Sequence, residues 1–199
     1  MARTLEFDRD DALGSAMHLF WRQGYVATSL NQLLAAMSIS RSSLYATFGD
    51  KRRLFIEALD LFSLRNNAMV DQAFNDAQPL LAVRAFFVDS VQNSTPTRLA
   101  RGCMMVNSIL ELADVDCELS QHAAKRLGEV ESRFQNCFEL AQSLGQLDKT
   151  YSPEYLAKMV MTLNQGLRVS SRKNVSVQEL SNVVETTLGL LGIEVKNRA

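Results

Sequence analysis

Three consecutive cations, Lys51, Arg52 and Arg53, are the first residues whose type and spacing point to a binding chemistry. They follow Asp50, which can open a helix, so they fall in a first turn, where the macrodipole disfavours positive charge. A phosphate at the same helix N-terminus would offset that cost, because backbone N–H groups and cations both attract it. A solvated run of surface charge is the alternative interpretation, and at this point both stay open.

A short polar segment lies directly before these cations. Residues 28–48 contain two short helical patterns joined by a tight turn at Met37, Ser38 and Ile39, with Thr28 and Ser40 as expected N-caps. The second helix, 41–48, ends at Gly49 and carries small polar residues on its outer face. A helix-turn-helix needs such a second helix, because its outward side chains must approach base edges in the major groove. The outward candidates are Arg41, Ser42, Ser43 and Thr47.

A family resemblance is carried by the segment ATSLNQLLAAMSISRSSLYATFGDKRRLF and the preceding LFWRQGY. It resembles the N-terminal DNA-binding domain of the TetR/AcrR regulators, without gaps from about Asp8 to Leu61. The resemblance implies a recognition helix at Ser40–Phe48 and phosphate contacts at Thr28, Tyr45 and Lys51. The full set of expected DNA contacts is Thr28, Ser29, Ser40, Arg41, Ser42, Ser43, Tyr45, Thr47 and Lys51.

One position departs from the family pattern. The family commonly has glycine in the turn where this chain has Ser38. If the turn is left-handed, a serine there costs about 1 kcal/mol. Ser38 therefore puts the left-handed geometry of the turn in question, though not the fold.

Composition and charge limit the possible classes of protein. The chain has 199 residues, 47% of them hydrophobic, and a formal net charge of −1, so any DNA contact must come from a local patch. Three cysteines without a CxxC pair predict neither a disulfide framework nor a zinc site, and they fit a reducing compartment. No signal segment or membrane span is apparent, so we expect a cytoplasmic protein with no membrane partner. No cofactor or metal is expected either.

Apolar residues recur at helical spacing almost throughout, which predicts an all-α protein of about nine helices. The clearest expected loop is the polar run 93–97, followed by a helix at about 101–113 and another capped by Asp116. The expected domains are 1–50, a helix-turn-helix DNA-binding domain joined by a helix from about residue 50, and 51–199. The resemblance implies that residues 51–199 form a helical ligand-binding and dimerisation domain.

A small-molecule effector, or an oxidant or electrophile, is the expected signal. Cys103 follows Gly102 at an apparent helix start with Arg98 and Arg101 close by in sequence, features that favour a reactive thiolate. The segment RGCMMVNSILELA also resembles a sub-pattern in which some family members use a cysteine as a sensor. Unpaired cysteines are more often inert core residues, and the same holds for pocket-type Met and Phe residues. The candidate sensing or ligand-binding residues are Cys103, Met104, Asn107, Phe86, Phe134 and Phe138.

The last two expected helices, about 153–171 and 177–191, are apolar on more than one face, which is typical of helices that have a partner. The resemblance implies a homodimer joined by two helices from each subunit. A twofold dimer would bind double-stranded DNA at an inverted repeat. The expected dimer contacts are Leu156, Val160, Leu163, Leu180, Val184 and Leu188.

An enzyme and a non-transcriptional DNA-binding protein are the two alternative classes of function. Catalysis is disfavoured because the two histidines, His18 and His122, have no nucleophile partner in the pattern, and no phosphate loop or metal-ligand spacing occurs. A non-transcriptional DNA-binding or adaptor protein would show the same DNA-binding helix, so the sequence does not separate it from a regulator. Binding at one or two promoters, against many dispersed sites, would distinguish them.

Overall fold

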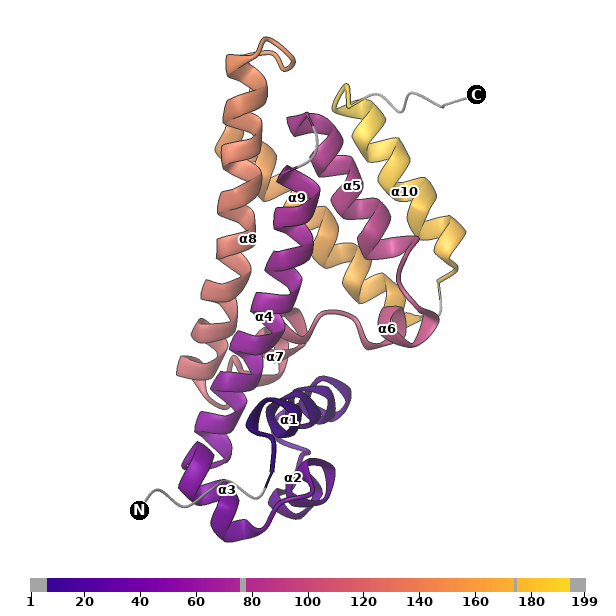
Figure 1. Ribbon diagram of the computed structural model, residues 1–199. Coiled ribbons are helices and arrows are strands. Elements are labelled where there is room, and N and C mark those ends of the chain that lie inside the picture. Colours follow the sequence, from indigo (N-terminus) through magenta and orange to yellow (C-terminus); the bar gives the residue numbers. More distant parts are fainter. Residues whose placement is uncertain (1–6, 76–77, 174, 194–199) are drawn as a thin grey trace. The chain divides into compact units, whose positions relative to one another are not determined.

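Ten α-helices and one 3-10 helix make up the part of the chain that this computed structural model describes, residues 7–75, 78–173 and 175–193 (Figure 1). No strand occurs in these ranges, and the predicted all-α fold is confirmed. The elements are α1 Arg9–Gln23, α2 Leu30–Met37, α3 Arg41–Phe48, α4 Lys51–Asn75, α5 Pro79–Val91, α6 Pro96–Arg101, α7 Met104–Leu112, α8 Cys117–Ser143, α9 Pro153–Ser170, η1 Ser171–Lys173 and α10 Val177–Leu190.

The chain divides into two compact units. The first contains the described residues up to Arg65 together with Cys103–Arg126, and the second contains Asn66–Gly102 and the chain from Leu127. This division differs from the expected boundary after residue 50, because α7 and the start of α8 pack with the N-terminal helices. A segment far along the sequence therefore belongs to the same unit as the candidate DNA-binding helices.

The start of α2 corrects one predicted helix cap. Ser29, and not Thr28, is the N-cap, since its side chain accepts from the Gln32 N–H while the Gln32 side chain accepts from the Ser29 N–H. This reciprocal pair is a capping box. The Thr28 hydroxyl instead donates to the Gly24 carbonyl oxygen at 2.6 Å.

The predicted loop at 93–97 partly forms a helix. Thr95 caps α6 by accepting from the Arg98 N–H, and Pro96 fits the first turn, where no N–H is needed. Gly102, at φ +67°, then ends α6, so the next helix begins at Met104 and not at the expected Arg101. The proposed cap of α8 is confirmed, because Asp116 accepts from the Leu119 N–H at 3.1 Å.

Aromatic packing forms the core of each unit. In the first unit the rings of Phe20 and Phe55 meet edge to face at 4.9 Å, and in the second Phe86 and Phe134 do so at 5.0 Å. Such pairs contribute beyond the area that they bury. Cys137 also lies in the second core, where its thiol donates to the Pro79 carbonyl and burial raises its pKa to about 12.

The turn between α2 and α3 takes the left-handed conformation that the sequence put in question. Ser38 has φ 54° and ψ 40°, and it is the non-glycine residue with positive φ in the described part of the chain. Its N–H bonds back to the last turn of α2, and the Ile39 N–H donates to the Leu34 carbonyl. The turn therefore keeps its geometry at the cost of local strain.

Replacing Ser38 by glycine should stabilise the protein. Relief of left-handed strain, about 1–2 kcal/mol, should exceed the added entropy of the unfolded chain, about 0.5–1 kcal/mol. We expect the free energy of unfolding in urea to rise by about 0.5–1 kcal/mol. Ala36→Gly, at an exposed position inside α2, should lower it by about 1 kcal/mol. A Ser38→Gly variant destabilised to the same extent would mean that Ser38 is not left-handed in solution.

Candidate nucleic-acid interface

Helix α3 presents a polar face because its apolar residues are buried on the opposite side. Leu44 and Phe48 lie in the core of the first unit. Ser40 caps the helix by accepting from the Ser43 N–H at 3.1 Å. The remaining side chains point outward to different degrees: Arg41, Ser42 and Tyr45 are exposed, and Ser43 and Thr47 are half-buried.

Thr28 is a correction to the predicted set of DNA contacts. Its side chain is fully buried and its hydroxyl donates to the Gly24 carbonyl, so this structure does not present the hydroxyl on the surface, and the predicted phosphate contact at Thr28 is not supported by its position. The neighbouring Ser29 is exposed at the N-terminus of α2 and keeps the predicted position for a phosphate contact. Threonine and serine can both cap a helix, and here they are adjacent, so the sequence pattern assigns the cap to the wrong one of the two.

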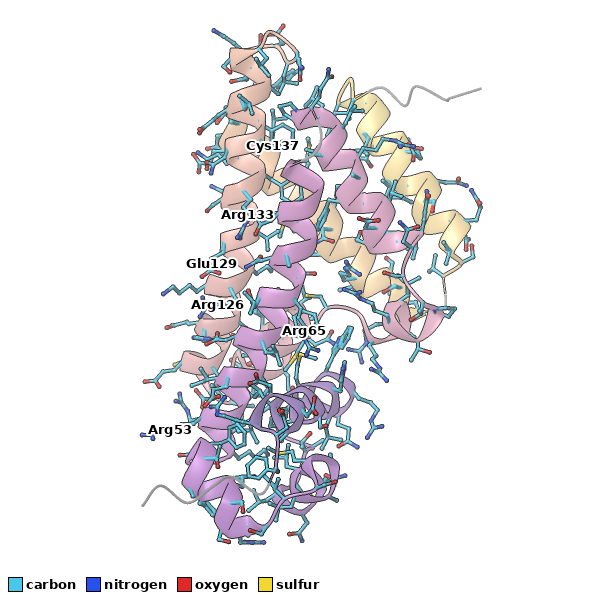
Figure 2. The ribbon with its side chains drawn as sticks, in the orientation of Figure 1. Arg53, Arg65, Arg126, Glu129, Arg133 and Cys137 are labelled. Atoms are coloured by element: carbon cyan, nitrogen blue, oxygen red, sulfur yellow. The ribbon has the colours of Figure 1, made fainter. Side chains whose placement is uncertain are left out.

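The three cations at the start of α4 have different surroundings. Arg52 bonds to Asp116 at 3.1 Å and Glu118 at 2.6 Å, so carboxylates, and not a phosphate, compensate its charge. The Lys51 ammonium lies 4.4 Å from the centre of the Tyr25 ring, and burial lowers its pKa while Glu111 acts in the opposite direction. Arg53 is exposed and projects away from the ribbon (Figure 2). Among the described residues, no carboxylate bonds to the side chain of Lys51 or Arg53 as Asp116 and Glu118 do to that of Arg52, so a phosphate contact at Lys51 stays a prediction.

A carboxylate from α7 holds the turn between α1 and α2. Glu111 accepts from the N–H of Tyr25 at 3.0 Å and from that of Val26 at 2.8 Å. Gly24, at φ +84°, makes this approach possible, because a Cβ built on it would lie 2.5 Å from a Glu111 carboxylate oxygen. The sequence offered no signal for this contact, since Glu111 lies 86 residues beyond Tyr25.

A second polar cluster links α4 to the first half of α8. Asp60 accepts from Arg126 and pairs with His122, both at 2.7 Å. Burial acts to raise the pKa of Asp60, but the hydrogen bonds from Arg126 and His122 outweigh it and hold the pKa below its usual value. His122, one of the two imidazoles considered as a catalytic base, thus has a structural hydrogen-bonding position.

The predicted sensing residues fall in both units. Cys103 is buried at the N-cap position of α7, Met104 is buried beside it, and Asn107 is half-buried. Phe86, Phe134 and Phe138 are buried in the second unit. Their assignment as ligand contacts stays a prediction.

The predicted dimer residues are largely interior. Leu156, Val160, Leu180, Val184 and Leu188 are buried within the single chain, because the strongest apolar stripe of each helix packs on its own unit.

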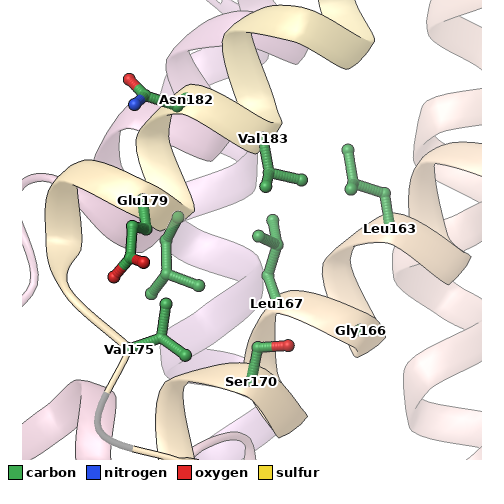
Figure 3. A pocket seen from close by; sticks show the side chains of 9 residues that line it. Leu163, Gly166, Leu167, Ser170, Val175, Glu179, Asn182 and Val183 are labelled. Carbon is green, nitrogen blue, oxygen red and sulfur yellow. The ribbon is translucent and has the colours of Figure 1, made fainter.

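A groove of about 590 Å³ lies between α9 and α10, where Leu163, Leu167 and Val183 gather (Figure 3). Of the predicted dimer residues, Leu163 and Leu180 line it. Val183 is also exposed, and elsewhere on the same helices the exposed apolar side chains include Tyr155, Met159, Val169 and Leu190.

The described residues contain no helix long and apolar enough to cross a membrane. Within the same ranges, no three His, Cys, Asp or Glu side chains come together in a way that could hold a metal ion.

Two family models match this chain. Residues 12–58 match the model described as bacterial regulatory proteins of the tetR family, and residues 79–186 match a tetracyclin repressor-like C-terminal domain. The transcriptional repressor ComR of Escherichia coli (strain K12) is 31% identical over 92% of this chain and 89% of its own length. YezE of Bacillus subtilis (strain 168), an uncharacterized HTH-type transcriptional regulator, is 28% identical over 96% of this chain and 100% of its own length.

A similar solved structure contains DNA. It is a cysteine mutant of the TetR family transcriptional regulator CifR, complexed with 26-bp double-strand operator DNA. It is 31% identical, with a TM-score of 0.83, and covers 96% of this chain and 100% of its own.

Lys51→Ala tests the phosphate contact at the start of α4. If Lys51 neutralises one phosphate, its loss should weaken binding to all duplexes alike and flatten the plot of log affinity against log salt by about one unit. The measurement is a salt titration of DNA binding by fluorescence anisotropy. Lys125→Ala removes an exposed cation from α8 and should leave the slope unchanged. An unchanged slope for Lys51→Ala would count against the contact.

Proposed function

The chain belongs to the TetR family of bacterial regulatory proteins and is a DNA-binding transcriptional regulator, and we propose that it represses its targets as a homodimer on an inverted-repeat operator. In this proposal a small molecule, or an oxidant or electrophile, releases it from DNA. The observation that carries the proposal is the exposed polar face of α3 beside Lys51 and Arg53.

The proposed binding mode places α3 in the major groove and the start of α4 against the sugar-phosphate chain. The outward side chains of α3 supply hydroxyl, guanidinium and phenol groups, which can hydrogen-bond to bases and phosphates. At the start of α4, backbone N–H groups and the Lys51 ammonium both attract a phosphate. Base contacts then give sequence preference, while phosphate contacts fix the position of the helix-turn-helix on the duplex.

The proposed dimer uses the outer faces of α9 and α10 and not the buried stripe. Tyr155 is 70% exposed, Val183 48% and Leu190 84%. Val183 lines the groove, and Tyr155 and Leu190 lie on the two helices that form it. Exposed apolar surface of this kind is unfavourable in water and is typical of an interface. A second copy related by a twofold axis would cover both faces at once.

The proposed signal acts through α7. Cys103 stands at its first turn and Glu111 near its last, where the carboxylate holds the turn before the DNA-binding helices. A maleimide would form an S–C bond to Cys103 as its C=C π bond opens and the thiol proton is replaced by one on the neighbouring carbon. Hydrogen peroxide would form an S–O bond as its O–O bond breaks and water leaves. Either product adds bulk to a buried position. Displacement of α7 would then weaken the hydrogen bonds from Tyr25 and Val26 to Glu111, and with them the turn that leads into α2 and α3.

Selection of bound duplexes from a random pool tests the proposed operator. The wild type should recover an inverted repeat, since a twofold dimer presents two equivalent α3 helices. Val183→Glu should give a monomer in sedimentation analysis, because it places a charge in the proposed interface, and it should lose most of its affinity for the two-half-site duplex.

Asn136→Glu is the matched control for this experiment, because it adds the same charge at an exposed position on α8. It should stay dimeric and select the same repeat. A Val183→Glu variant that stays dimeric would show that the subunits join elsewhere. A wild type that recovers no common sequence would refute the regulator proposal.

Cys103→Ser tests the proposed sensor. Hydrogen peroxide or N-ethylmaleimide should release the wild type from its selected duplex, and the serine variant should bind that duplex normally and stay bound. Cys117→Ser, at an exposed thiol, should respond like the wild type. Cys137 should stay unmodified at neutral pH, because its raised pKa leaves almost no thiolate. Release of Cys103→Ser equal to that of the wild type would leave Cys103 as a core residue.

A further inference from the structure

Arg41 and Asn31 join the two helices of the helix-turn-helix on their exposed side. Arg41 is the first residue of α3, and Asn31 is the second residue of α2. The Arg41 Nη2 donates to the Asn31 Oδ1 at 3.1 Å, and both side chains are exposed. The guanidinium therefore has a defined orientation before any DNA is bound.

The serines of the same turn are engaged with one another. The Ser40 hydroxyl lies 2.8 Å from the hydroxyl of Ser42 and 2.8 Å from that of Ser43. These short side chains form a chain of hydrogen bonds close to the helix surface. Arg41 is the long side chain of this first turn, so it is the one suited to extend toward the floor of a groove.

The partner of Arg41 is neutral, and this distinguishes it from Arg52. Two carboxylates compensate Arg52, whereas the amide oxygen of Asn31 leaves the positive charge of Arg41 in place. A guanidinium has five N–H donors, and this hydrogen bond uses one of them. A planar guanidinium held in one orientation loses less entropy when its other donors bind a target.

From this geometry we infer that Arg41 recognises one guanine in each operator half-site, through O6 and N7, and that Asn31 is its positioning residue. The inference rests on the proposed function. Guanine offers two acceptors on its major-groove edge that match two parallel guanidinium N–H groups. N-terminal residues of the second helix of a helix-turn-helix contact base edges, whereas Lys51 and Arg53 are placed for phosphates.

The test compares base preference and not affinity alone. A duplex selected from a random pool by the wild type is remade with each base pair replaced in turn, and binding is measured for wild type, Arg41→Ala and Asn31→Ala. The wild type should prefer G·C at one position of each half-site by about 10- to 100-fold. Arg41→Ala should lose the preference at that position and keep it elsewhere. Asn31→Ala should reduce it by roughly 3- to 10-fold, the worth of one orienting hydrogen bond.

Arg53→Ala is the matched control, because it removes an exposed arginine of the same unit from the phosphate-facing site. It should weaken all duplexes alike and keep the guanine preference, and thermal melts should show that each variant is folded. If Arg41→Ala keeps the guanine preference and weakens every duplex equally, Arg41 is a phosphate contact and the inference fails. An unchanged preference in Asn31→Ala would overturn the role of Asn31. A wild type without any base preference would refute the proposed function itself.

Discussion

The two hydrogen bonds from the Tyr25 and Val26 N–H groups to Glu111 are the constraint on which the helix-turn-helix of α2 and α3 depends. They satisfy backbone donors in the turn after α1, and they require a residue without a side chain at Gly24. Burial lowers the pKa of Lys51, whose ammonium lies over the Tyr25 ring, while the charge of the same carboxylate acts to raise it. One acidic residue of α7 thus fixes the turn that leads into α2 and influences the charge on Lys51, the cation proposed to contact a phosphate.

Local chemistry made most of the fold predictable from the sequence. Helical spacing and the caps at Ser40 and Asp116 have short-range causes, and the structure confirms them. Two local predictions are wrong: Ser29, and not Thr28, caps α2, and α6 begins at Pro96, inside the run 93–97 that the sequence predicts as a loop. In both places several adjacent polar residues can cap a helix. The division into two units could not be predicted, because it depends on contacts between α7 and helices more than eighty residues away.

The site was predictable where its residues lie on one short helix and not where they depend on distant partners. The outward position of Arg41, Ser42 and Tyr45 follows from the period of α3. The different surroundings of Lys51 and Arg52 follow from Glu111 and Asp116, which no local pattern connects to them. In α9 and α10 the pattern identified the apolar stripe but not which of two apolar faces the chain itself covers.

The carboxylates on Arg52 also bear on how such a protein searches a chromosome. Nonspecific attraction to duplex DNA grows with the number of uncompensated cations, and bulk DNA offers a vast excess of competing sites. Asp116 and Glu118 remove one cation from that count without touching the side chains of α3. Fewer molecules are then held on irrelevant DNA, and more of them are free to find the few sites that α3 distinguishes.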